Sequence, residues 1–196
     1  MVLEEGYVYH IYNKTNNHMP LFYSRENYLF FLDKFKYHIS PFCSILAWCL
    51  MPTHFHLMVY VNKTKIDNRK EDLNSSIGKM LSSYTRSIQK QQKITGSIFQ
   101  NHTKAKCLNQ IESLSPNYWQ TEFGTQINIE QDGHNYPLIC FNYIHMNPVA
   151  DCMVHSHEDW EFSSYRDYFN GRNGKLIDYD RAKEELGEIF ISLNNF

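Results

Sequence analysis

The alternation of side chains between residues 54 and 61 is the strongest periodic signal in the chain, and it predicts a β-strand. Successive side chains of a strand point to opposite faces of the sheet, so residues two apart share a face. One face would consist of Phe55, Leu57, Val59 and Val61. The other would consist of His54, His56, Met58 and Tyr60. We expect the first face to pack against a core and the second to be able to face a site.

Apolar residues recur at helical spacing in two segments, at about residues 24–39 and 72–93, and predict two helices. Ser24 and Asp72 are suitable N-caps, because their side-chain oxygens can accept hydrogen bonds from the first turn. The apolar stripe of the second helix consists of Leu73, Ile77, Met80, Leu81, Tyr84 and Ile88. We expect this stripe to pack on the sheet.

Five further elements follow from the remaining patterns. Strands are predicted at about residues 6–13, 43–50 and 97–108, and helices at about 136–146 and 181–190. The first of these two helices is expected to end at Asn147-Pro148, because a residue before proline disfavours the helical conformation.

The predicted order of the first six elements is strand, helix, strand, strand, helix, strand. This order is typical of an α+β fold, and we expect a ferredoxin-like antiparallel sheet with helices packed mainly on one face. The length of 196 residues suits a single domain covering residues 1–196. Residues 109–135 are polar and lack a clear period, so we expect an irregular insertion there.

Composition excludes several classes of protein. A hydrophobic content of 42% and a net charge of −2 fit neither a disordered polyelectrolyte nor a membrane protein. The five cysteines form no CxxC pair, and an odd number argues against a disulfide framework. The first residues are acidic where a signal peptide would be basic, so we expect a cytoplasmic protein without a membrane partner.

Charge is distributed unevenly along the chain. Residues 62–106 hold ten basic and three acidic side chains, a local charge of +7. Such a segment can face phosphates, although a Lys-rich helix is also often only a solvated surface. Charge alone therefore does not identify a nucleic-acid-binding protein.

The tripeptide His54-Phe55-His56 is the sharpest local signal for chemistry. Two imidazoles two residues apart on a strand project to the same side, about 6 to 7 Å apart at the backbone. They could share one divalent cation, with a third ligand from elsewhere in the chain. The alternative interpretation is a pair of partly exposed strand histidines without a metal.

Tyr84 lies in the apolar stripe of the helix at residues 72–93, which could bring its phenol near the histidine pair. The simpler interpretation is a core tyrosine whose hydroxyl is hydrogen-bonded. A cation beside a tyrosine on a basic helix is, however, what phosphodiester cleavage by a tyrosine nucleophile requires. The combination therefore points to cleavage of a nucleic-acid backbone.

Five stretches of the chain carry a family resemblance. They are YVYHIYNKTNNHMPLF at 7–22, CLMPTHFHLMV at 49–59, YTRSIQKQQKITGSIFQ at 84–100, YIHMNPV at 143–149 and FSSYRDY at 162–168. In this order they resemble the REP-associated tyrosine transposases, within the single-tyrosine HUH (His-hydrophobic-His) transposase superfamily. The stretches are spread over most of the chain and keep the order of the family, and MPTHFHL resembles the signature of the family most closely.

The resemblance implies roles for individual residues. His54 and His56 match the metal-binding histidines, and Tyr84 takes the position of the nucleophilic tyrosine. Gln89 is nominated as the third metal ligand, with Gln92 as the competing amide. The implied contacts to the DNA backbone come from Arg86, Lys90, Lys93, Gln100, Lys104 and Lys106.

The implied reaction is cleavage and rejoining of single-stranded, hairpin-forming DNA through a 5′-phosphotyrosine, without ATP. The implied cofactor is Mg²⁺ or Mn²⁺, and imidazole ligands would also accept zinc. The implied partners are single-stranded or hairpin DNA, and the resemblance allows a homodimer.

Two other functions remain open from the sequence. The first is a domesticated DNA-binding protein that keeps the fold without catalysis, and the second is a replication initiator or relaxase. The chain departs from the family at Asn101-His102-Thr103-Lys104, where relatives carry a basic-aromatic-Lys run, so DNA contacts there are expected to differ.

Overall fold

The computed structural model describes residues 1–109, 119–120, 126–127 and 136–187. The strands are β1 (Val8–Lys14), β2 (Cys43–Met51), β3 (His54–Val61), β4 (Lys104–Cys107), β5 (Trp119–Gln120) and β6 (Gln126–Ile127). The α-helices are α1 (Arg25–His38), α2 (Leu73–Gln92), α3 (Tyr136–Ala150), α4 (Tyr165–Phe169) and α5 (Tyr179–Leu186). Short 3₁₀-helices are η1 (Asn16–His18) and η3 (His157–Asp159).

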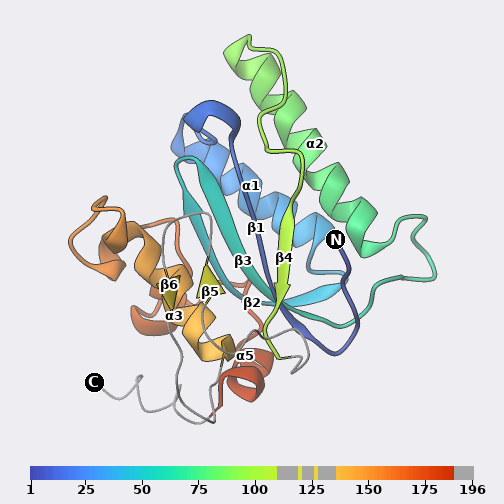
Figure 1. Ribbon diagram of the computed structural model, residues 1–196, viewed down its shortest axis with the longest axis vertical. Coiled ribbons are helices and arrows are strands. Elements are labelled where there is room, and N and C mark those ends of the chain that lie inside the picture. Colours follow the sequence, from blue (N-terminus) through green and yellow to red (C-terminus); the bar gives the residue numbers. More distant parts are fainter. Residues whose placement is uncertain (110–118, 121–125, 128–135, 188–196) are drawn as a thin grey trace.

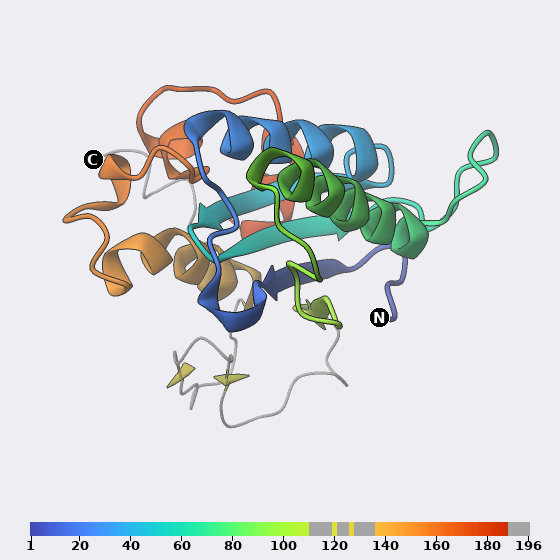
Figure 2. The same ribbon diagram turned by 90° about the horizontal axis from the view of Figure 1, so that it is seen from above.

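A four-stranded antiparallel sheet with the strand order β2-β3-β1-β4 forms the centre of the molecule. This order, with α1 and α2 as the two connecting helices, is that of a ferredoxin-like βαββαβ unit, which confirms the predicted α+β fold. Both helices lie on the same side of the sheet, and α3 lies on the other side (Figure 1, Figure 2). The small hairpin of β5 and β6 falls within the predicted insertion, most of which lies outside the described residues.

The face of the sheet below α1 and α2 carries the larger core. Phe55 and Leu57 of β3 point into it, as the alternation predicts, and Phe31 of α1 packs against Phe55 with ring centroids 5.3 Å apart. The helix α2 begins where the sequence predicts, because the Asp72 side chain accepts a hydrogen bond from the Ser75 backbone N–H at 2.8 Å.

A second core fills the opposite face, between the sheet and the C-terminal helices. Phe141 and Ile144 of α3 and Leu186 of α5 are fully buried there, together with Met58 of β3. Both faces of β2 and β3 are therefore covered, which explains why nearly every residue of these strands is buried.

The prediction that Asn147-Pro148 ends the helix at residues 136–146 is wrong. The helix α3 continues through Pro148 to Ala150. Proline has no backbone N–H, so Pro148 cannot donate the helical hydrogen bond to the Ile144 carbonyl four residues earlier. The side chain of Asn147 donates to the Tyr143 carbonyl at 2.7 Å, one turn earlier in the helix.

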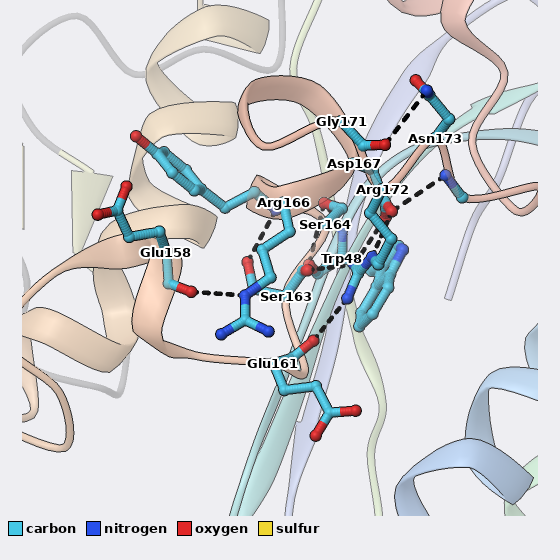
Figure 3. A network of polar contacts seen from close by, with 12 residues as sticks. Trp48, Glu158, Glu161, Ser163, Ser164, Arg166, Asp167, Gly171, Arg172 and Asn173 are labelled. Atoms are coloured by element: carbon cyan, nitrogen blue, oxygen red, sulfur yellow. Dashed lines mark hydrogen bonds and ion pairs between the residues drawn. The ribbon is translucent and has the colours of Figure 1, made fainter.

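An ion pair between the partly exposed Arg172 and the buried Asp167 links the segment of residues 161–174 to β2 (Figure 3). Arg172 donates to both carboxylate oxygens of Asp167 and to the carbonyls of Glu161 and Ser163, and its guanidinium lies 5.3 Å from the ring of Trp48. Asp167 is only 3% exposed. The pair therefore bridges α4, the loop after it and the middle of β2.

A hydrogen-bond junction beside this pair joins α3 to the same strand. Ser164 accepts from the Trp48 backbone N–H at 2.9 Å, and its hydroxyl lies 2.7 Å from His145 Nε2 of α3. The orientation of α3 thus depends on contacts to β2.

Of the helices that the structure describes, none has the length and apolar character needed to cross a membrane.

Candidate functional site

His54 and His56 lie on the face of β3 that is turned toward α3. Their ring centroids are 5.0 Å apart and the ring planes are nearly perpendicular, with an angle of 89°. Phe55 between them points to the opposite face, into the core below α1 and α2. The predicted pairing of the two imidazoles on one face of a strand is therefore confirmed.

A neighbouring side chain holds the Nδ1 atom of each imidazole. His56 Nδ1 lies 2.8 Å from Nε2 of His10 on β1, and His54 Nδ1 lies 3.1 Å from the hydroxyl of Thr53. A metal ion bound by the pair would therefore be coordinated through Nε2 of each ring.

Burial keeps the histidines of this face neutral. It lowers the pKa of His54 to about 4, with a further contribution from Lys14, and lowers the pKa of His10 to about 3, with a further contribution from Lys106. Burial, followed by the neighbouring His10 and His54, also holds the pKa of His56 well below its usual value. Neutral imidazoles are the form that coordinates a metal ion.

Acid should destabilise the fold because of these buried imidazoles. Burial also lowers the pKa of His145 to about 3. A histidine with a depressed pKa in the folded state contributes its full stability above about pH 6.5 and loses it as the pH falls toward the folded value. We expect the free energy of unfolding to fall between pH 6.5 and 4.5 by about 1.4 kcal/mol per pH unit for each such histidine. Urea titrations across this range measure the slope, and a flat profile would contradict the burial of neutral histidines.

Tyr84 does not lie beside the histidine pair, and this part of the sequence prediction is wrong. Its ring is 0% exposed in the core below α1 and α2, where it packs on Phe31 with centroids 4.7 Å apart. Its hydroxyl donates to the Leu21 carbonyl at 2.8 Å, and burial raises its pKa. The sheet separates this phenol from the two imidazoles, so the simpler interpretation of a core tyrosine holds.

Gln89 is also remote from the histidines. Its side chain donates to the Gly96 carbonyl at 2.6 Å, where it closes the C-terminal end of α2. The competing amide, Gln92, is the last residue of the same helix. Both nominations for the third ligand are therefore corrected, because α2 lies on the other side of the sheet.

Two tyrosines lie beside His56: Tyr12 of β1, with ring centroids 6.0 Å apart, and Tyr143 of α3, which approaches from the opposite layer. Tyr143 is the nearer of the two. Its ring lies edge-on to His56, with centroids 5.5 Å apart, and its centroid is 6.0 Å from that of His10. It is 6% exposed. The sequence carried a signal for it in YIHMNPV, a stretch that resembles the transposase family, but the helical pattern there marked Tyr143 only as an apolar position.

Asn147 follows Tyr143 by four residues on α3, so both side chains lie on the same face of the helix. It is 5% exposed. Its Nδ2 is bonded to the Tyr143 carbonyl, so Oδ1 is the atom that could coordinate an ion beside the histidines. Within the described ranges no three His, Cys, Asp or Glu side chains form a metal-binding group.

The sheet brings two of the predicted DNA-binding lysines to the histidine face. Lys106 is paired with His10 and Lys104 with Tyr12 across β4 and β1, and directly opposed residues share a face. Lys14 is likewise paired with His54. Lys106 is partly buried, which lowers its pKa. This face therefore combines neutral imidazoles with positive charge.

The remaining predicted contacts lie in the layer of α2. Arg86, Lys90 and Lys93 are exposed on its C-terminal half and the residue after it. Arg86 and Gln100 line a shallow groove between this helix and the loop before β4. The structure does not bring these residues together with the histidine pair.

Comparison with known proteins supports the fold. No family model matches the sequence, and neither does any curated protein. The chain is similar to a solved structure described as a REP-associated tyrosine transposase bound to a REP hairpin. The two share 16% sequence identity, with a TM-score of 0.60 over 91% of this chain and 92% of the other. The likeness shows that this chain has the fold of that transposase.

Proposed function

We propose that this chain cleaves and rejoins single-stranded, hairpin-forming DNA, with Tyr143 as the nucleophile. The observation that carries the proposal is the contact of the Tyr143 ring with His56, on a fold shared with a hairpin-bound tyrosine transposase. Tyrosine attack on a phosphodiester needs a phenol next to groups that stabilise charge on the phosphate oxygens.

In the proposed step the Tyr143 oxygen forms a bond to phosphorus and the bond from phosphorus to the 3′ oxygen breaks. The phenol loses its proton, and the leaving 3′ oxygen gains one. The products are a 5′-phosphotyrosine and a free 3′-hydroxyl. The reverse attack by a 3′-hydroxyl rejoins the strands, because the phosphotyrosine conserves the phosphodiester.

The donor set fits a divalent cation, which we propose is Mg²⁺ or Mn²⁺. His54 and His56 would bind it through Nε2 and Asn147 through Oδ1. A cation held there would supply Lewis-acid stabilisation of the scissile phosphate. The chain itself orients the two imidazoles through His10 and Thr53 and holds Tyr143 on the same face.

A hairpin oligonucleotide offers the direct test. Incubation with Mn²⁺ should produce a covalent protein–DNA adduct that survives denaturing electrophoresis, and EDTA should prevent it. Peptide mapping of the trapped adduct should identify Tyr143. Absence of an adduct under every divalent ion tested would contradict the catalytic proposal.

Burial of the site supports a second candidate function, a noncatalytic DNA-binding protein. His54, His56 and Tyr143 are 6%, 0% and 6% exposed, so a phosphate reaches them only if the layer over this face opens. A noncatalytic protein would bind the hairpin equally well with or without EDTA and would form no adduct.

Lysines on the histidine face should contribute more to DNA binding than lysines on α2. We expect the double variant Lys104→Ala/Lys106→Ala to weaken single-stranded DNA binding roughly tenfold near physiological salt and to reduce the salt slope by about 1.4. The matched variant Lys90→Ala/Lys93→Ala removes the same charge from the α2 layer and should have a smaller effect. Fluorescence anisotropy at several salt concentrations measures both quantities. A larger loss of DNA affinity in Lys90→Ala/Lys93→Ala would indicate that the DNA binds on the α2 side of the sheet.

A further inference from the structure

His10 is a buried histidine next to the proposed metal ligands. It is 0% exposed in the middle of β1, where its ring stacks on that of Tyr12 with centroids 4.7 Å apart. Its Nε2 lies 2.8 Å from His56 Nδ1, and the two rings are nearly parallel, with an angle of 22°. The sheet thus holds the two imidazoles in a fixed mutual geometry.

One proton lies between these two nitrogens, since a hydrogen bond between neutral imidazoles needs one donor and one acceptor. If His10 donated, His56 would carry its own proton on Nε2, and that nitrogen could not coordinate an ion. If His56 donates from Nδ1, its Nε2 presents a lone pair. Only the second arrangement is compatible with metal binding.

We propose that His10 is a positioning residue that accepts a hydrogen bond from His56 Nδ1 and thereby fixes His56 as a ligand through Nε2. The inference rests on the proposed function, because it presumes a cation at the histidine pair. It assigns to β1 a part in the site that the motif His54-Phe55-His56 does not contain.

The partner of His54 shows what is distinctive about this arrangement. The Thr53 hydroxyl can donate or accept, so it leaves the tautomer of His54 open. His10 is a rigid ring, held between Tyr12 and the edge of Tyr143. Its position also fixes the ring plane of His56, and outer partners of this kind typically change metal affinity by 10- to 100-fold.

Two substitutions at His10 test the proposal. His10→Phe keeps an aromatic ring of similar shape but cannot accept the hydrogen bond, whereas His10→Gln retains an acceptor oxygen. Mn²⁺ affinity, measured from the electron paramagnetic resonance signal of the free ion, should fall roughly 10- to 100-fold in His10→Phe. His10→Gln should recover most of it. Thermal unfolding of each variant shows whether it is folded.

The tautomer of His56 gives a second readout that does not depend on metal or activity. Nitrogen-15 NMR of the metal-free protein should show the proton of His56 on Nδ1 in the wild type and a shift of that population toward Nε2 in His10→Phe. A wild-type His56 protonated on Nε2 would overturn the inference.

The variant His54→Ala separates this inference from the proposed function. If Mn²⁺ binding depends on His54 but is the same in His10→Phe as in the wild type, the role of His10 is wrong and the metal site stands. If the wild type binds no Mn²⁺, the proposed cation site fails and the role of His10 fails with it.

Discussion

Replacing Tyr143 with phenylalanine should abolish the covalent DNA adduct and reduce strand cleavage by several orders of magnitude. The change removes only the attacking oxygen and leaves the ring that packs against His56. Binding of the hairpin should therefore remain close to that of the wild type. Quantitative gel analysis of adduct formation, with anisotropy for binding, measures the two effects separately.

Tyr84→Phe is the matched control for this variant. It removes the hydrogen bond to the buried Leu21 carbonyl, so the free energy of unfolding should fall by roughly 1 to 3 kcal/mol. The adduct should persist, because the sheet lies between Tyr84 and the histidines. Loss of the adduct in Tyr84→Phe together with its survival in Tyr143→Phe would reverse the assignment.

The placement of Tyr84 shows what helical periodicity can and cannot predict. The stripe on residues 72–93 correctly indicates which face of α2 is buried. It does not say which face of the sheet receives that stripe. If both helices pack on the apolar face of β3, with Phe55 and Leu57, then a residue of that stripe lies across the sheet from the histidines. The alternation on β3 and the stripe on α2, taken together, therefore argue against a contact between Tyr84 and the histidine pair.

The strand of the histidines was predictable because its signal is local. Alternation determines the face of each residue from 54 to 61. The start of α2 is also a local feature, because it depends on the N-cap hydrogen bond of Asp72. The neighbours of the histidines are not local. His10 reaches His56 through the register of β1 on β3, and Tyr143 reaches it through the packing of α3. Strand register and helix docking depend on tertiary contacts that a single sequence does not specify.

The sequence analysis missed Asn147, the proposed amide ligand, for a related reason. The dipeptide Asn147-Pro148 reads as a helix stop, and a residue beyond a helix would not share a face with Tyr143. Because α3 continues to Ala150, Asn147 lies one turn after Tyr143 and faces the same side. A wrong helix boundary thus concealed a candidate ligand.

Replacing Arg172 with alanine should lower the free energy of unfolding by about 3 kcal/mol. The Asp167 carboxylate would remain buried, with the Gly174 backbone N–H as a remaining donor at 3.1 Å. Burying a charge without its partner is costly, and Arg172 also bonds two backbone carbonyls. Denaturant unfolding of the two proteins measures the difference.

The exposed ion pair of Arg25 and Glu161 provides the control, because its side chains are 57% and 38% exposed. Arg25→Ala should change stability little, since water screens such a pair.

Arg172→Ala should also affect function through Ser164, which joins the segment of Arg172 and His145 of α3 to β2. Loosening this segment should let α3, and with it Tyr143, shift from the histidines. Adduct yield in Arg172→Ala should therefore fall as the temperature rises and recover on cooling. Equal stability of the two alanine variants would show that the pair of Arg172 and Asp167 does not hold residues 161–174 in place.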